Sequence, residues 1–314
     1  MSTDKAKVMV TSSLGEAVKE LFGLSLEGRL CILTQEVMND EVAKAYNQIG
    51  SLARLETYRR IVEDFKNRTG CYAVNHLCFD LGNILDVGCG SGLLSLELAQ
   101  QTAGDIVGVD LSSDMVGLAN ENLTRRSKER IEEIKEFWEK ILWYCKPGKE
   151  EHEKLERNPP LLDKVQFRIG SVYDLPEIVR DISQINYVVC RNALHRFKEL
   201  KLAIQKMYQV VAPGGKIYIR DLRRDADWKT VIERIGEERW NRPVLVKDYI
   251  GAMAAMLTVE EVHSLLKELG ISDYQVTDGN YQIREKTAQP PRMTEYASEV
   301  EYVCVIHKPL TPKT

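Results

Sequence analysis

The chain has 314 residues, 44% of them hydrophobic and 29% charged, with seven cysteines and a formal net charge of −4 at pH 7. This composition is typical of a globular protein, and the slight negative charge gives no electrostatic reason to expect nucleic acid as a partner. The scattered cysteines form no Cys-x-x-Cys motif, no run is apolar enough to span a membrane, and no signal-peptide pattern begins the chain, so we expect a cytoplasmic protein without a disulfide framework.

Helical patterns dominate the first eighty residues. Ser13 and Glu16 have the spacing of a capping box ahead of an apolar stretch. Apolar residues at intervals of three or four then predict an amphipathic helix that ends at Gly70. We expect residues 1–52 to form a helical cap that packs against the core. Alternatively they form a lid over a ligand site, with Tyr46 lining its mouth.

A glycine-rich turn follows a short apolar run at residues 84–87. The run predicts a buried strand, and the apolar spacing after Gly88, Gly90 and Gly92 predicts a helix. Glycine allows positive φ angles and the close approach of a ligand, and the first turn of a helix offers unpaired N–H groups. The stretch therefore predicts a binding site for a ligand with an anionic end.

A second apolar strand is predicted over residues 105–110, ending in Asp110. A carboxylate about 20 residues after such a glycine turn can accept hydrogen bonds from ribose hydroxyls. A helix follows, and the connection to the next strand is far longer than the usual roughly 2–6 residues. We interpret residues 124–163 as an inserted helical hairpin. It is either a solvated excursion or a platform for the substrate or a protein partner.

Strands and helices alternate again after this insertion. The remaining apolar runs that predict strands cover residues 165–169, 185–190, 216–221, 274–276 and 302–306. Residues 223–256 are looser and more polar, and a capping box at Thr258 begins a helix. The alternation predicts an α/β fold, with a mainly parallel seven-stranded sheet, helices on both faces and an antiparallel last strand. Ligands bind such sheets outside the carboxyl ends of the strands.

Two kinds of nucleotide site fit the glycine turn. A dinucleotide-binding domain expects G-x-G-x-x-G or G-x-G-x-x-A, whereas Leu93 stands where the last small residue would be. An acidic residue, Asp86, also stands two positions before the first glycine. Because a lone glycine pattern is weak evidence, the stretches that follow decide whether the site is of the dinucleotide type or of another nucleotide type.

Five stretches in order resemble the motifs of class I S-adenosylmethionine-dependent methyltransferases. They cover residues 86–92, 109–115, 170–176, 190–195 and 212–216. The nearest subgroup is the small-molecule type similar to the ubiquinone/menaquinone methyltransferases. The resemblance implies a Rossmann-like core made of residues 53–123 and 164–314. It also implies S-adenosylmethionine as the cofactor, with S-adenosylhomocysteine as the product.

The resemblance also implies roles for residues around the cofactor. Asp86 would orient the amino group, Asp110 would bind the ribose, and Gly88 and Gly90 would leave room for the methionine part. The other expected cofactor contacts are Cys89, Leu111, Met115, Ser171, Val172, Arg191 and Asn192. Many relatives have an aspartate in place of Ser171, so the usual contact to the adenine amine would need a substitute.

Methyl transfer requires a nucleophile held in line with the S–CH3 bond and the exclusion of water. His195 follows the fourth strand and is a candidate general base, although a structural role is the alternative. The candidates for lining the acceptor pocket are Tyr46, Tyr173, Asp225 and Trp228. We find no cluster with metal-ligand spacing and expect no metal.

The sequence thus predicts in-line methyl transfer to a small-molecule or natural-product acceptor, peptides included. The alternatives are a protein or RNA methyltransferase and a non-catalytic regulator that binds S-adenosylmethionine. The acceptor atom and the oligomeric state stay open.

Overall fold

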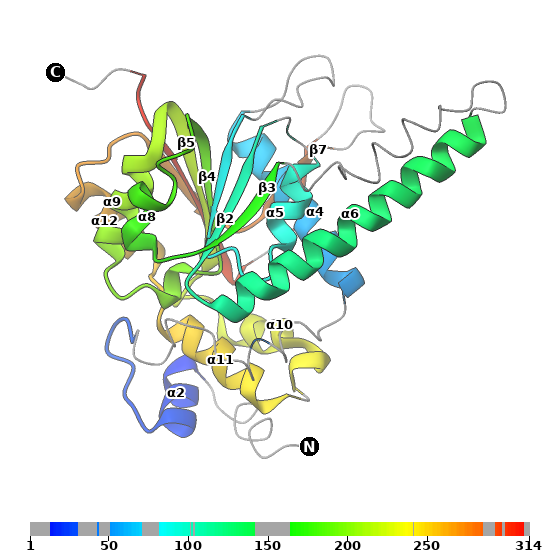
Figure 1. Ribbon diagram of the computed structural model, residues 1–314. Helices are drawn as coiled ribbons and strands as arrows, with labels where there is room; N and C mark the ends of the chain where they lie inside the picture. Colours follow the sequence, from blue (N-terminus) through cyan, green and yellow to red (C-terminus); the bar gives the residue numbers. More distant parts are fainter. Residues whose placement is uncertain are drawn as a thin grey trace.

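The computed structural model describes residues 13–30, 43, 51–70, 82–100, 102, 104–141, 164–240, 242–284, 293–296 and 299–310. Its centre is a seven-stranded sheet in the order β3-β2-β1-β4-β5-β9-β6 (Figure 1). The strands are β1 (Ile84–Val87), β2 (Ile106–Asp110), β3 (Val165–Ile169), β4 (Ile185–Arg191), β5 (Val211–Leu222), β6 (Tyr274–Asp278) and β9 (Glu301–His307). Among these seven, β9 alone runs in the direction opposite to the other six, which confirms the predicted fold class.

Helices cover both faces of the sheet (Figure 1). They include α4 (Ser51–Arg68), α5 (Leu93–Ala99), α6 (Ser113–Ile141), α8 (Leu175–Ile178), α9 (Leu200–Val210) and α12 (Val259–Glu268). Successive strand residues face opposite sides, so Val188 and Val189 of β4 belong to two different buried clusters. The cluster around Val189 lies under α4 and α5, and the cluster around Val188 lies under α9 and α12.

The first described helix, α2 (Leu14–Phe22), begins as the capping pattern predicts. The Ser13 hydroxyl accepts a hydrogen bond from the Glu16 amide at 3.2 Å, and Gly23 ends the helix with a φ of 71°. The helix packs against α11 (Pro243–Ala254). Most of the predicted cap, including Tyr46, lies outside the described residues, so the choice between cap and lid stays a prediction.

Helix α6 changes the boundary of the predicted insertion. It runs unbroken from Ser113 to Ile141, so the boundary at residue 124 falls inside a helix. No glycine or proline interrupts this part of the helix beyond Gly117, and Arg125 and Glu129 form an ion pair one turn apart at 2.9 Å. The distal part of α6 projects away from the sheet (Figure 1). Residues 142–163 lie outside the described residues, and the hairpin itself stays a prediction.

The expectation of a loose polar stretch at residues 223–256 is wrong. It contains α10 (Trp228–Trp240) and α11, in which Leu245, Val246 and Ile250 are buried. The charged residues of α10 suggested a loop, yet a helix can expose charge on one side. Sequence reasoning also missed the hairpin of β7 (Tyr281–Arg284) and β8 (Met293–Tyr296), which packs on α4. Within the described ranges, no helix is both long and apolar enough to cross a membrane.

A buried ion network fixes α4 and the hairpin to the sheet. Arg220 of β5 is fully buried and donates hydrogen bonds to Asp64 of α4 at 3.2 Å and to Glu301 of β9 at 2.9 Å. Its guanidinium lies 3.7 Å from the ring centre of Tyr281 in β7. Because a buried cation needs such partners, this network sets where α4 lies beside the carboxyl ends of the strands.

Candidate functional site

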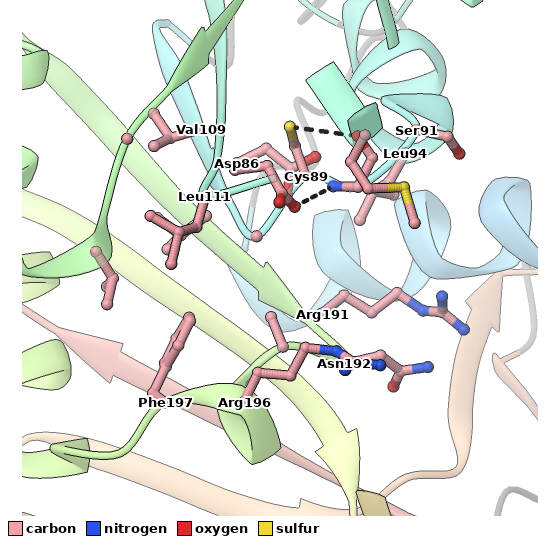
Figure 2. Close-up of a pocket in the computed structure, with 18 of the residues that line it drawn as sticks. Asp86, Cys89, Ser91, Leu94, Val109, Leu111, Arg191, Asn192, Arg196 and Phe197 are labelled. Atoms are coloured by element: carbon pink, nitrogen blue, oxygen red, sulfur yellow. Dashed lines mark hydrogen bonds between the residues drawn. The ribbon is translucent and has the colours of Figure 1, made fainter. Parts of the chain in front are cut away.

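A cleft at the carboxyl ends of β1, β2 and β4 is the candidate site (Figure 2). It holds about 1000 Å³ of open space, including the solvent at its mouth. Every predicted cofactor-binding residue except Ser171 lines this cleft. The lining also includes residues that the sequence did not single out for binding: Tyr58, Val87, Ser91, Leu94, Val109, Gly170, Ala193, Arg196 and Phe197.

The three glycines of the turn all have positive φ angles, but they serve different purposes. A Cβ atom on Gly88 would lie 2.4 Å from the Cβ of Ala193, and one on Gly92 would lie 2.5 Å from the Phe167 ring. These two glycines therefore allow close packing within the protein. A Cβ on Gly90 would meet nothing within 4 Å. Since Gly90 lines the cleft, its missing side chain leaves room for a ligand.

Asp110 ties the end of β2 to the glycine turn. One carboxylate oxygen accepts a hydrogen bond from the Gly90 amide at 2.8 Å, and the other accepts one from the Ser112 amide at 2.9 Å. Burial raises the pKa of Asp110, and these amides, together with the Arg196 charge, oppose that rise. Because a carboxylate oxygen can accept more than one hydrogen bond, both oxygens remain available to ligand hydroxyls.

Asp86 is a buried carboxyl group at the floor of the cleft. Its side chain accepts a hydrogen bond from the Ser95 hydroxyl at 2.6 Å. Burial raises its pKa to about 6, the Ser95 hydrogen bond and the Arg191 charge lower it, and the Asp110 charge adds to the rise. A cationic ligand group beside Asp86 would favour the carboxylate form.

The Cys89 thiol also lines the cleft. Burial, with the charges of Asp86 and Asp110, raises its pKa well above the ordinary value. Since the thiolate is the reactive form of cysteine, Cys89 acts here as a small apolar residue and not as a nucleophile.

The opposite wall of the cleft is the post-β4 segment, which we define as residues 191–198. Figure 2 shows Arg191, Asn192, Arg196 and Phe197 across the cleft from Asp86 and Cys89. The Arg191 guanidinium lies 5.3 Å from the ring centre of Tyr58, so α4 also contributes to this wall. No sequence signal marked Tyr58 as a cleft residue, because its helical spacing predicts only burial.

Asn192 has two unusual features. Its φ angle of 49° is the only positive value of a non-glycine residue in the described part of the chain. Its side-chain oxygen is buried and has no hydrogen-bond partner among the described residues. Buried polar atoms are normally paired, so an unpaired oxygen at the cleft fits a site that receives a hydrogen-bond donor from a ligand.

His195 does not line the cleft, contrary to its predicted role as a general base. It is only 4% exposed, and its Nδ1 atom lies 3.3 Å from an oxygen of Asp221. The short 3-10 turn at Leu194–Arg196 places the ring in the interior beside β5. The geometry therefore favours the structural alternative.

The described residues predicted for the acceptor pocket also lie outside the cleft lining. The Tyr173 hydroxyl accepts a hydrogen bond from the Glu199 amide at 3.0 Å, and Asp225 pairs with Arg223 at 2.8 Å. Trp228 begins α10 and packs against the core. Ser171, predicted to contact the cofactor, caps a short 3-10 turn, where its hydroxyl accepts from the Tyr173 amide at 3.2 Å. Each side chain serves local structure, which position in the sequence alone does not reveal.

Among the described residues, no group of three or more His, Cys, Asp or Glu side chains could hold a metal ion.

Solved structures share this architecture. A putative S-adenosylmethionine-dependent methyltransferase from Methanococcus maripaludis has a TM-score of 0.52 and 18% identity, covering 93% of this chain and all of that one. The plantazolicin methyltransferase BpumL, solved with S-adenosylhomocysteine, has a TM-score of 0.55 and 14% identity, covering 86% of this chain and 91% of that one. At these identities the similarity shows the fold.

Sequence comparison points the same way. An arsenite methyltransferase of Halobacterium salinarum is 22% identical over 195 residues, which is 62% of this chain and 38% of that protein. An uncharacterized methyltransferase of Schizosaccharomyces pombe is 25% identical over 145 residues, or 46% of this chain and 40% of that protein. The chain thus matches about two fifths of the length of these curated relatives. The family model of the methyltransferase domain matches residues 54–276. The chain therefore belongs to the methyltransferase-domain family.

Proposed function

We propose that the chain binds S-adenosylmethionine in the cleft and transfers its methyl group to a small-molecule or natural-product acceptor, peptides included. The observation that carries this proposal is the open space at Gly90 in a cleft that also holds the buried carboxyl group of Asp86 and the half-buried one of Asp110. Carboxylates there suit the ammonium group and the ribose hydroxyls of that cofactor. The unpaired oxygen of Asn192 offers a further acceptor to a bound ligand.

The cofactor would supply a methyl group that its sulfonium already activates. The chain's residues then have to bind, orient and exclude water. Asp110 would accept hydrogen bonds from hydroxyls, and Asp86 would face the ammonium group. The apolar side chains of Leu111, Met115 and Val172 would flank the adenine.

A general base is needed only when the nucleophile carries a proton that must leave. His195 is held beside Asp221 and does not line the cleft, so we do not assign it this role. The proposal is therefore an in-line displacement in which positioning supplies most of the catalysis.

The cleft wall and the net charge support a small acceptor over a nucleic acid. Tyr58 and Phe197 give the cleft aromatic surface, and Arg191 and Arg196 add two guanidinium groups, which together fit a compact polar molecule. The net charge of −4 gives no general attraction to RNA.

The test is to incubate the protein with methyl-labelled S-adenosylmethionine and a cell extract separated into small molecules, peptides, proteins and RNA. Label in the small-molecule or peptide fraction would support the proposal. Label only in protein or RNA would overturn the acceptor class. No label in any fraction, despite calorimetric binding of the cofactor, would identify a non-catalytic regulator. Asp110→Asn is the control that should lose the labelling.

A further inference from the structure

The post-β4 segment is held by charged side chains from distant parts of the chain. This segment runs from Arg191, the last residue of β4, through the 3-10 turn at Leu194–Arg196 towards α9, and it contains Asn192 with its positive φ. A positive φ costs most non-glycine residues about 1–2 kcal/mol and asparagine less, and several contacts hold Asn192 in this conformation. The Asn192 amide donates to the carbonyl of Arg220 at 3.0 Å, which is the first of these contacts.

Asp221, next to Arg220 in β5, binds the amides of the segment. One oxygen of its fully buried carboxylate accepts hydrogen bonds from the amides of Ala193 and Leu194, both at 2.9 Å. The other oxygen accepts from its neighbour Leu222 and faces the ring of His195. The carboxylate thus fixes the turn that follows Asn192.

Arg29 binds the carbonyls of the same segment. Its guanidinium donates to the carbonyls of Leu194 at 3.4 Å and Lys198 at 3.5 Å, and also to that of Phe197. Its Nε atom donates to the carbonyl of Ala255, just after α11, at 2.7 Å. Arg29 lies outside residues 54–276, the part of the chain that the family model matches.

These contacts determine where the segment meets the cofactor cleft. Ala193 packs against Gly88 so closely that a Cβ on Gly88 would lie 2.4 Å from its side chain. A small movement of the segment would therefore change the distance between the two walls.

We propose that Arg29 and Asp221 are positioning residues that hold the post-β4 segment so that Arg191 and Asn192 meet the amino-acid part of S-adenosylmethionine. This inference rests on the proposed function, because it names the cofactor that the cleft binds. Neither residue touches the cofactor in this proposal. Each acts through the main chain of the segment.

The test compares two ligands by isothermal titration calorimetry. S-adenosylhomocysteine has the amino-acid part, and 5′-methylthioadenosine lacks it. Arg29→Met is expected to raise the Kd of S-adenosylhomocysteine about tenfold, and that of 5′-methylthioadenosine less than about threefold. Asp221→Asn should show the same selective loss, because an amide cannot accept hydrogen bonds with both of its polar atoms. A merely structural role would not discriminate between the ligands.

Arg224→Met is the matched control. Like Arg29, Arg224 is partly buried and donates to a main-chain carbonyl beside α11, that of Met256 at 2.6 Å. Unlike Arg29, it pairs with Glu261 instead of the carbonyls of the post-β4 segment, and it does not line the cleft. It should lower the melting temperature about as much as Arg29→Met while leaving both Kd values unchanged. Melting curves of all variants identify any that fail to fold, and the Arg29 variant alone suffices for the comparison.

Two results would overturn the inference while leaving the proposed function intact. One is a wild type that binds S-adenosylhomocysteine and an Arg29→Met variant that binds it equally well. The other is an equal loss of affinity for both ligands in that variant. A wild type that binds neither ligand would instead overturn the proposed function, and this inference with it.

Discussion

The two walls of the cleft are built in different ways. The glycine turn lies between β1 and α5, and its shape follows from glycines at fixed positions and from Asp110 at the end of the next strand. The post-β4 segment contains no glycine, and its shape depends on Arg29, Asp221 and Asp248 from elsewhere in the chain. A wall specified by its own backbone can be recognised in a sequence. For the wall held by remote side chains, the sequence identified Arg191 and Asn192 through the family motif over residues 190–195, but not the side chains that hold them in place.

The largest expected effect comes from forcing the two walls apart. Gly88→Ala places a Cβ 2.4 Å from that of Ala193 at a φ of 70°. We expect a loss of about 2–4 kcal/mol in the free energy of unfolding, from steric overlap and backbone strain together. The Kd of S-adenosylhomocysteine should rise at least about a hundredfold. Urea unfolding and calorimetry measure the two effects.

Adding Ala193→Gly to Gly88→Ala tests whether steric overlap causes the loss of stability and affinity. It removes the overlapping atom and should recover the steric part of the loss but not the part due to the positive φ. A double variant no better than Gly88→Ala alone would show that the contact between the walls is not what matters.

Gly90→Ala should separate binding from stability. Gly90 has a φ of 54°, but its added Cβ would meet nothing within 4 Å. We expect a stability loss of only about 1–2 kcal/mol from the backbone. The affinity for S-adenosylhomocysteine should still fall at least about tenfold, because the methyl group enters the ligand's space. Unchanged affinity would mean that the ligand does not approach the turn at this position.

The pH dependence of S-adenosylmethionine binding tests the role of Asp86, which lies at the floor of the cleft. Burial raises the Asp86 pKa to about 6, so the free protein holds this proton across a range where the unfolded chain, with a pKa near 3.8, has lost it. The contribution of Asp86 to stability therefore falls as the pH rises from about 4 to 6. The affinity of Asp86 for a cationic ligand instead rises over this pH range, because the carboxylate form becomes populated.

We accordingly expect S-adenosylmethionine to bind about tenfold more tightly at pH 7 than at pH 5. Calorimetry at three pH values would measure this change. In Asp86→Asn, which cannot ionise, the dependence should largely disappear. If the variant keeps the wild-type pH profile, another group is responsible.

The smallest expected effect concerns the outer end of the post-β4 segment. Arg196 pairs with Asp248 of α11 at 2.9 Å, and both side chains are partly exposed. Asp248→Ala should weaken S-adenosylhomocysteine binding no more than about fivefold, because such pairs contribute at most about 1 kcal/mol. A loss as large as that expected for Arg29→Met would mean that the segment depends on all its contacts equally.

The difference between contacts with sequence neighbours and contacts with remote residues also explains which features could be predicted from the sequence. The mainly parallel sheet follows from alternating strands and helices, and the capping boxes at Ser13 and Thr258 locate two helix starts correctly. These features depend on neighbours in the sequence. The glycine turn and Asp110 were identifiable as a binding site for the same reason.

Other features depend on contacts that sequence spacing does not encode. His195 stands at the end of the fourth strand, as a base would, but the buried carboxylate of Asp221 turns it inward. Tyr58 has the spacing of a core residue, yet Arg220 and Asp64 fix its helix where the ring reaches the cleft. The partner of His195, Asp221, lies on β5. For Tyr58 the deciding residue is Arg220, which lies more than a hundred positions later in the chain.

The partners of Arg29 also bear on how the protein forms during synthesis. The carbonyls of Leu194 and Ala255 follow Arg29 by 165 and 226 positions. At about 5–20 residues per second, the ribosome takes roughly 11–45 s to travel from Arg29 to Ala255. The glycine turn and its carboxylate partner are complete long before that, since Asp110 follows Gly90 by only 20 positions. The residues of one wall are therefore synthesised early, whereas Arg29, which binds the other wall, has a partner in Ala255 that is synthesised only after α11.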